Sequence, residues 1–527
     1  MKRLTIQMMT LALLLVLGLA SCKKWDIKPE VDVTSETVYS SVTGYKQVLA
    51  KVYGSFALTG NAGPDGQGDV QGIDEGTSDF LRLFWKAQVL STDEAVVGWG
   101  DPGIRDFHNM NWTVTNPMLT GLYYRLAYSI TLSNEFIRES APDRLSRRGI
   151  TGNDAATVAT FRAEARFMRA YAYWAAMDLY GSFPFTDENT PLGSTPPPMR
   201  TRAQLYAFIE AELKAIEPAL ANARTNEYGR ADKAAAWALL ARIYLNAGVY
   251  TGTPNFNEAA TQARRVIDAG YSLIGDYRHL MLADNNLNTS EFILTLNYDG
   301  ERTRNWGGTT FLTHASVGGA MNASLSGING GWGGIRTTRR IPELFPDFTG
   351  AADRRAQFFQ QNLDINNIAE FGDGFAITKY RNVNRAGVRP ANFVNWVDID
   401  FPIFRLAEMH LIYAEAVLRG ATTGTSAQAL TYMNALRQRA YGNTNGNIGP
   451  SQLNLDFIID ERARELYWEG HRRTDLIRFN RFTESTYLWP WKGGVPSGTG
   501  VPAFRRLYPI PSSDLTTNPN LVQNPGY

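Results

Sequence analysis

Residues 161–180 read FRAEARFMRAYAYWAAMDLY and form the clearest helical pattern in the chain. Small alanines alternate with aromatic residues on the helical period, which lets neighbouring helices approach closely. Gly181 follows directly and Pro184 lies just beyond, as is typical of a helix end. The sequence therefore predicts a helix over 161–180 that packs against other helices.

Two further segments predict pairs of helices of the tetratricopeptide type. In residues 233–246, side chains at offsets of three, four and seven match the first helix of such a repeat, and they are Trp237, Leu240, Ala241 and Tyr244. Residues 259–267 can supply the second helix after an insertion at 251–257. Residues 404–419 and 427–440 give a similar pair. Such pairs bury their apolar faces only by stacking.

The rest of the chain divides by composition. Helical patterns are predicted at 34–53, 122–138 and 454–469, a Gly/Asp-rich loop at 60–76, and a short strand at 292–296. Residues 271–400 are rich in Gly, Asn, Thr and Trp. We therefore expect a mainly α fold, in which a tetratricopeptide-like helical repeat scaffold carries a large loop-rich layer and a few short strands. The expected regions of this one domain are 34–270, 271–400 and 401–527.

The N-terminus has the pattern of a bacterial lipoprotein signal. Lys2 and Arg3 precede an apolar run at 11–19, and small residues lead to Cys22, the only cysteine in the 527 residues. The run is too short to cross about 30 Å of hydrocarbon. We expect 1–21 to be removed, Cys22 to carry lipid, and 22–33 to be a tether. The alternative is ordinary secretion with an incidental thiol.

Composition narrows the classes of function. Lys and Arg total 52 and Asp and Glu total 51, so the net charge of +1 gives no field for binding nucleic acid. With Cys22 lipidated, no cysteine is left for a disulfide, a thiolate metal site or a nucleophile. The sequence contains 12 Trp and 24 Tyr, a large supply of flat faces for stacking.

Several separated motifs resemble the SusD/RagB family of outer-membrane nutrient-binding lipoproteins of the Bacteroidetes. They are EARFMRA at 164–170 with LYGSFP at 179–184, AWALLARIYL at 236–245, RLAE at 405–408 with YAEA at 413–416, NALRQRA at 434–440, ERAREL at 461–466 with EGHR at 469–472 and DL at 475–476, and the closing YPIP at 508–511 with NPN at 518–520 and QNPGY at 523–527. Their order along the chain, together with the lipoprotein signal, carries the resemblance.

The late charged motif has a structural interpretation. Glu461, Glu465 and Glu469 recur at i+4 on one predicted helix face, and Arg462, Arg464 and Arg472 are near enough to pair with them. Because arginines match the carboxylates in number, we predict ion pairs that fix the helix to the scaffold. His471 belongs to the same block.

Signals of catalysis are weak. The five histidines follow no zinc spacing, and neither a G-x-S-x-G nor a P-loop motif occurs. Asp65, Asp69 and Asp74 could bind Ca²⁺, although a solvated acidic loop fits their spacing better. Two carboxylates brought together by the fold could still make a glycosidase. We predict a protein that is not an enzyme and has no catalytic residue, metal or cofactor.

Two loop regions combine aromatic and polar side chains as sugar sites do. The candidate ligand-binding residues are Trp99 and Asp101 in the first region and Tyr298, Trp306 and Trp332 in the second. The alternatives for these tryptophans are loop packing and a partner interface. By contrast, Trp85, Trp174 and Trp237 lie on helical periods and are predicted to be core.

The resemblance implies a role and partners. It implies a lipid-anchored, surface-exposed outer-membrane protein that binds an oligosaccharide, or less often a peptide, and passes it to a SusC-like TonB-dependent transporter. The helical scaffold would face the transporter and the loop layer the ligand. A tetratricopeptide-like scaffold that binds only protein is the further alternative.

Overall fold

The computed structural model describes residues 35–64, 68–191, 193, 196–391 and 395–527. Cys22 and the predicted signal peptide and tether lie outside these residues. The helices of the first part of the chain are α2 (Ser35–Val38), α3 (Val42–Ala57), α4 (Phe80–Val89), α5 (Asp106–Asn109), α6 (Pro117–Glu139), α7 (Pro142–Arg147), α8 (Gly152–Tyr180) and α9 (Arg202–Ile216).

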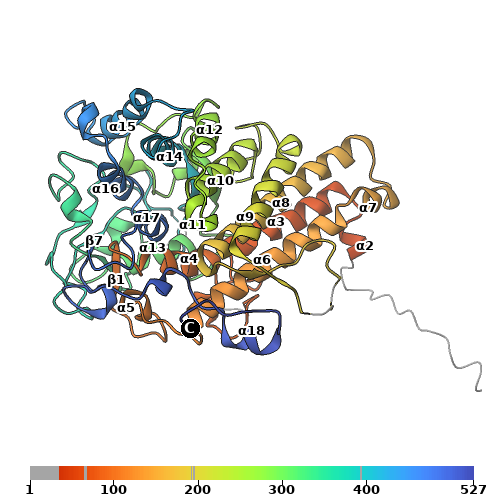
Figure 1. Ribbon diagram of the computed structural model, residues 1–527, viewed down its shortest axis with the longest axis horizontal. Coiled ribbons are helices and arrows are strands. Elements are labelled where there is room, and N and C mark those ends of the chain that lie inside the picture. The colour runs from red at the N-terminus through yellow and green to blue at the C-terminus, as the bar shows by residue number, and fades with distance from the viewer. Residues whose placement is uncertain (1–34, 65–67, 192, 194–195, 392–394) are drawn as a thin grey trace, which may run out of the picture.

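Helices α3, α6, α8 and α9 pack against one another at one end of the long axis (Figure 1). The predicted helix over 161–180 ends at Tyr180 as expected, with Gly181 at φ 76°. It begins at Gly152, earlier than predicted, and the buried Val158 ties its first turns to the core. Helix α6 also starts early, because the Asn116 side chain accepts hydrogen bonds from the backbone N–H groups of Met118 and Leu119.

The second helical group stacks α10 on α12, α12 on α14 and α14 on α15 (Figure 1). The helices of this part are α10 (Lys233–Leu245), α11 (Ala247–Thr251), α12 (Phe256–Ile267), α13 (Gly308–Ala315), α14 (Leu406–Leu418), α15 (Ser426–Tyr441), α16 (Leu455–Leu466), α17 (Arg472–Arg478) and α18 (Ser512–Thr517). The mainly helical fold is thus confirmed, while the tetratricopeptide-like repeat stays a prediction.

Two further helix boundaries differ from the prediction. Phe404 and Arg405 belong to a strand, so α14 begins at Leu406. Helix α16 ends at Leu466, since Trp468 takes a left-handed backbone with φ 68°. Glu469 therefore lies beyond the helix and not on its face.

The strands of the described residues form four two-stranded antiparallel sheets. They are β1 (Ala95–Val97) with β5 (Ile335–Thr337), β2 (Phe183–Pro184) with β3 (Met199–Arg200), β4 (Phe292–Leu296) with β8 (Phe401–Arg405), and β6 (Phe358–Phe359) with β7 (Ala376–Ile377). Strand β4 has the predicted bounds, and β8 leads directly into α14. The pairs β1–β5 and β4–β8 therefore join the loop-rich residues 271–400 to segments that precede and follow them in the sequence.

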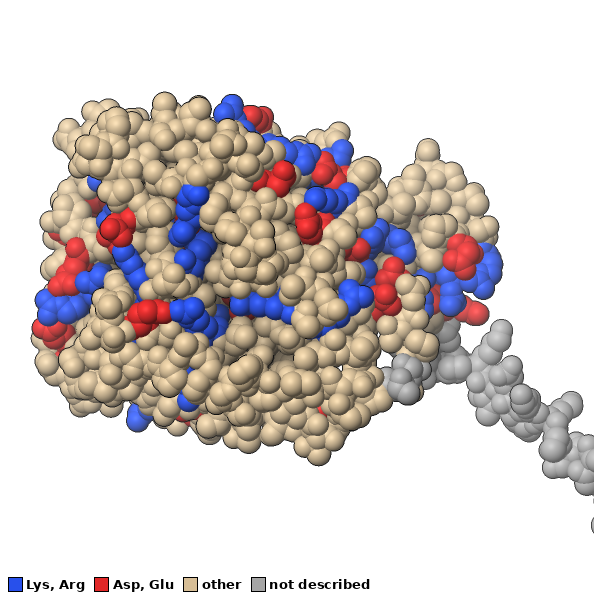
Figure 2. Space-filling view, in the orientation of Figure 1, with Lys and Arg blue, Asp and Glu red and all other residues tan. Residues whose placement is uncertain are grey.

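One hydrophobic core runs through the helical scaffold and the loop layer. Trp85 and Trp174 are buried in it as predicted, whereas Trp237 is half-buried and packs against it. Lys, Arg, Asp and Glu are interspersed on the face shown in Figure 2, in keeping with the small net charge. Within the part of the chain that the structure describes, no helix is long and apolar enough to cross a bilayer.

Candidate functional site

The pairing of β1 with β5 brings two predicted tryptophans together. The backbone N–H of Gly98 donates to the Gly334 carbonyl at 2.9 Å, which continues the ladder past both strand ends. The Trp99 indole N–H then donates to the Trp332 carbonyl at 3.3 Å, and the two rings lie 6.3 Å apart. A Cβ on Gly334 would lie 2.1 Å from the Trp99 ring, so only glycine leaves room for this ring.

Helix α13 holds the loop that carries Trp332. The last carbonyls of a helix lack partners within it. Here Trp332 and Gly334 donate backbone hydrogen bonds to the carbonyls of His314 and Ala315, at 2.8 and 3.0 Å. The His314 ring also stacks on the Trp332 ring at 4.9 Å, and burial lowers the pKa of His314. These contacts fix the position of Trp332.

Two more indoles extend the row. The Trp306 ring lies 6.1 Å from Trp332 and 4.2 Å from Trp396. All four tryptophans are half-buried. We call Trp99, Trp332, Trp306 and Trp396 the aromatic arc, in that spatial order. Trp396 was not among the predicted residues, although Asn395 before it matches the Gly or Asn neighbours of the other three.

Arg82 of α4 contacts the backbone and the rings of the arc. Its Nη1 donates to the carbonyls of Trp306 and Gly76, both at 2.8 Å. Its guanidinium lies 4.8 Å from the Phe311 ring and 5.8 Å from the Trp332 ring, and burial lowers its pKa. Arg82 thus ties the backbone of Trp306 to the residues beneath Trp332.

The two other predicted ligand residues lie differently. Asp101 is exposed on the loop after Trp99, where Arg105 donates to the Trp99 carbonyl at 2.8 Å and holds that loop. Tyr298 is only 5% exposed and packs beneath α13, where a Cβ on Gly308 would lie 2.4 Å from its ring. The structure therefore places Tyr298 in the core against α13.

Two aspartates of the predicted acidic loop at 60–76 contact other protein side chains. Asp69 lies 3.0 Å from Lys51 and 3.6 Å from Arg125, while Asp74 accepts a hydrogen bond from Thr77. Asp65 lies outside the described residues. Among the residues that the structure does describe, no group of three or more His, Cys, Asp and Glu side chains could hold a metal ion.

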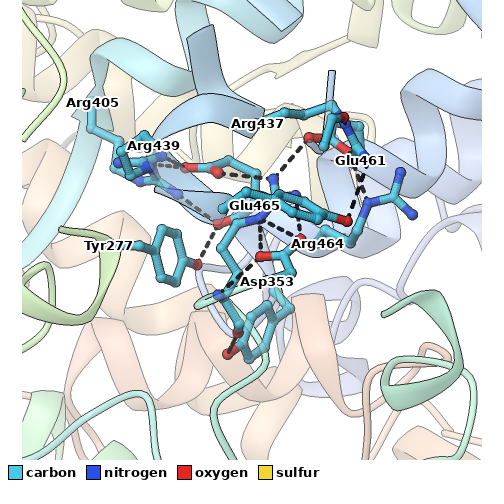
Figure 3. A network of polar contacts seen from close by, with 12 residues as sticks. Tyr277, Asp353, Arg405, Arg437, Arg439, Glu461, Arg464 and Glu465 are labelled. Carbon is cyan, nitrogen blue, oxygen red and sulfur yellow. Dashed lines mark hydrogen bonds and ion pairs between the residues drawn. The ribbon is translucent and has the colours of Figure 1, made fainter. Parts of the chain in front are cut away.

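The late glutamates form a buried network of ion pairs (Figure 3). Glu461, Glu465 and Glu469 are all buried, and the cations that converge on them are Arg355, Lys379, Arg405, Arg437, Arg439 and Arg464. Burial alone would raise the pKa of Glu461, but its arginines outweigh burial and lower the pKa to about 2.

The prediction that these glutamates form ion pairs holds, but most partners differ from those expected. Of the three predicted arginines, only Arg464 pairs within the set, at 2.7 Å from Glu461. Arg462 pairs with Asp475 and Arg472 with Asp93. The cations instead come from other segments, which the local sequence could not reveal.

Residues 369–527 match the model of the SusD family, and residues 104–245 match a model described as starch-binding associating with outer membrane. The starch-binding protein SusD of Bacteroides thetaiotaomicron is 34% identical, with 99% of this chain and 98% of that protein covered. The chain belongs to the SusD family.

Solved structures share the SusD-family fold. A SusD superfamily protein from Bacteroides thetaiotaomicron superposes with a TM-score of 0.71 at 19% identity, covering 92% of this chain and all of that one (100%). Surface glycan-binding protein A of the same species, in complex with laminarihexaose, gives 0.68 at 21% identity, covering 92% of this chain and 99% of that one. At these identities the likeness shows the fold alone.

Proposed function

We propose that this SusD-family protein is a lipid-anchored protein of the outer membrane that binds oligosaccharide on the aromatic arc. The observation that carries the proposal is the row of four half-buried indoles, each in ring contact with the next. Sugar rings have apolar faces that dock on indoles, while the hydroxyl groups bind polar side chains at the rim. Asp101 and Asn395 are exposed next to the arc and supply such groups.

The shape of the arc favours a curved glycan chain. Neighbouring rings are tilted by 48°, 56° and 55° along the row, so the four faces do not share a plane. A glycan that coils along its length can meet successive tilted faces, whereas a flat ribbon-like chain meets fewer. The relatives named for binding starch and laminarihexaose support this class of ligand.

Contacts within the protein hold the arc in place. Trp99 and Trp332 are joined by a hydrogen bond, Trp332 is held by α13, and Arg82 binds the backbone of Trp306. A preformed surface loses little conformational entropy on binding. This arrangement suits capture, and we propose that the protein has no catalytic role.

The arc can be tested by calorimetric titration with α-1,4-glucans and β-1,3-glucans. We expect Trp332→Ala and Trp306→Ala each to weaken binding by about 1–3 kcal/mol, with little change in melting temperature. Trp237→Ala is the matched control, because Trp237 is a half-buried tryptophan on α10 and should leave affinity unchanged. Unaltered affinity in both arc variants would refute the assignment, and released sugars would indicate a glycosidase.

The bound glycan would then pass to a SusC-like TonB-dependent transporter. The family motifs support this step, and so does the family model described as associating with outer membrane. Mild detergent extraction followed by mass spectrometry tests it. A TonB-dependent barrel should be enriched over unrelated outer-membrane proteins, and the absence of such enrichment would remove the transfer step.

A further inference from the structure

A second tryptophan-bearing loop lies at residues 483–501. Four of its residues have a left-handed backbone, at φ 69° for Trp491, 66° for Gly493, 75° for Gly494 and 78° for Gly498. Glycine adopts this conformation without strain, and a bulky residue does so only at a cost. Three of the four positions hold glycine, so the tryptophan at the fourth requires an explanation.

Burial explains the comparable case of Trp468 but not that of Trp491. Trp468, at φ 68°, is fully buried, lies 5.3 Å from Trp85 and donates its backbone N–H to Glu94. Trp491 is half-buried at the surface. Its neighbours in the loop, Leu488 and Val495, are 38% and 39% exposed. The loop thus presents apolar side chains to solvent around a tryptophan whose backbone is strained.

Hydrogen bonds and a ring contact fix the loop 483–501 and the Trp491 indole. Lys492 is fully buried, and its ammonium donates to the carbonyls of Glu484 and Tyr487 at 2.7 and 2.8 Å. The same ammonium lies 4.3 Å from the Trp489 ring. The Trp491 indole N–H donates to the Ile365 carbonyl at 2.9 Å, which fixes one edge of the ring.

This loop is a near neighbour of the Trp99 end of the aromatic arc. The Ile368 carbonyl lies 3.0 Å from the place of a Cβ on Gly98, beside Trp99. Ile365 and Ile368 are three residues apart, a span of at most roughly 10 Å. On its other side the loop meets α5, where a Cβ on Gly494 would lie 2.8 Å from Asn109. One short segment therefore separates Trp491 from the arc.

We propose that Trp491 is a second carbohydrate subsite, which binds a hexose ring of the same glycan chain that lies on the aromatic arc. Asp364 and Asn366 flank Ile365, are exposed, and can bind sugar hydroxyl groups there. The inference rests on the proposed function of the arc. Because residues 365–368 lie between the two surfaces, a glycan reaches Trp491 only if it extends past the stretch that is bound on the arc, and the second contact is then intramolecular.

The test measures by calorimetry how tightly Trp491→Ala and Trp491→Gly bind short and long glycans. Maltotriose is compared with soluble starch, and laminaritriose with laminarin. We expect both variants to bind the polysaccharide about tenfold more weakly than wild type and the trisaccharide equally well. Trp237→Ala serves again as the control.

Melting curves separate binding from folding. Trp491→Gly should melt at or above the wild-type temperature, because glycine removes the backbone strain. A large drop in melting temperature would show that Trp491 is a packing residue and would overturn the proposal. If Trp332→Ala weakens polysaccharide binding but the two Trp491 variants bind polysaccharide as tightly as wild type, this subsite alone is overturned. A wild type that binds no glycan would overturn both the subsite and the arc.

Discussion

At the scale of single residues, the arc depends on the absence of a side chain at Gly334, next to the Trp99 ring. Trp99 rests on the backbone at Gly334, where the nearest ring atom lies 2.1 Å from the place of a Cβ. At Gly330, in the same loop, a Cβ would meet nothing within 4 Å. These two glycines therefore differ in their packing although both are in one loop.

We predict that Gly334→Ala weakens glycan binding about tenfold or more, because the methyl group must displace the Trp99 ring from its place beside Trp332. Gly330→Ala should bind like wild type, since its methyl group enters open space. Isothermal titration of both variants measures the difference. Equal affinities for the two would show that the place of Trp99 does not matter for the ligand.

The site residues illustrate how far the sequence alone could lead. Flanking Gly or Asn residues singled out Trp99, Trp306 and Trp332, and the structure brings these three half-buried rings together in one row. The same signal was available at Trp396. Nothing local marked Tyr298 as buried, since its cover is α13, a helix that begins with Gly-Thr-Thr at Gly308 and was not predicted. Glycine and threonine are poor helix formers, and in α13 they are helical because tertiary contacts bury the segment.

At the scale of elements, α16 is attached to its surroundings by charge. Glu465 lies 2.6 Å from Arg405 and 3.3 Å from Arg355, and all three side chains are almost completely buried. Removing one member of a buried ion pair leaves its partners unpaired at low dielectric. This cost applies even where the intact network adds little net stability.

We predict that Glu465→Gln lowers the free energy of unfolding by about 3–5 kcal/mol. Glu258→Gln is the control, because Glu258 is exposed in the first turn of α12 and should change stability by no more than about 0.5 kcal/mol. Urea denaturation followed by circular dichroism measures both. A Glu465 variant as stable as the control would mean that the network does not hold the helix.

The same network predicts the response to acid. The folded-state pKa of Glu461 is lowered from 4.5 to about 2, so its stabilisation is complete above about pH 4.5 and is lost as the pH falls towards 2. Urea midpoints measured between pH 6 and pH 2 should therefore decline mainly below about pH 4.5. A midpoint that stays constant over this range would contradict the assignment of these ion pairs.

Helix boundaries show the limit of local patterns. The aromatic and alanine period located 161–180, but GNDAATVAT before it has no such period, and that part of α8 is helical because Val158 packs into the core. The i+4 spacing of the glutamates suggested one helix through Glu469, whereas the chain turns at Trp468. In both places long-range contacts decide the boundary, and those contacts are not visible in a single sequence.

At the scale of the whole molecule, the predicted lipid on Cys22 is the sole attachment to the membrane that we propose. We expect Cys22→Ala to be released into the soluble fraction with an unchanged melting temperature, because residue 22 precedes the first described helix. Membrane fractionation and a melting curve check this. Retention of the variant in the outer membrane at the wild-type level would contradict the anchor.

We propose above all that the aromatic arc is the glycan-binding surface of the whole protein. A crystal structure of the protein with a bound α-1,4-linked or β-1,3-linked oligosaccharide would locate the sugar. We expect its rings to be stacked on Trp332 and Trp306, with hydroxyl groups near Asp101 or Asn395. Sugar bound elsewhere, with the four indoles of the arc free of contact, would contradict it.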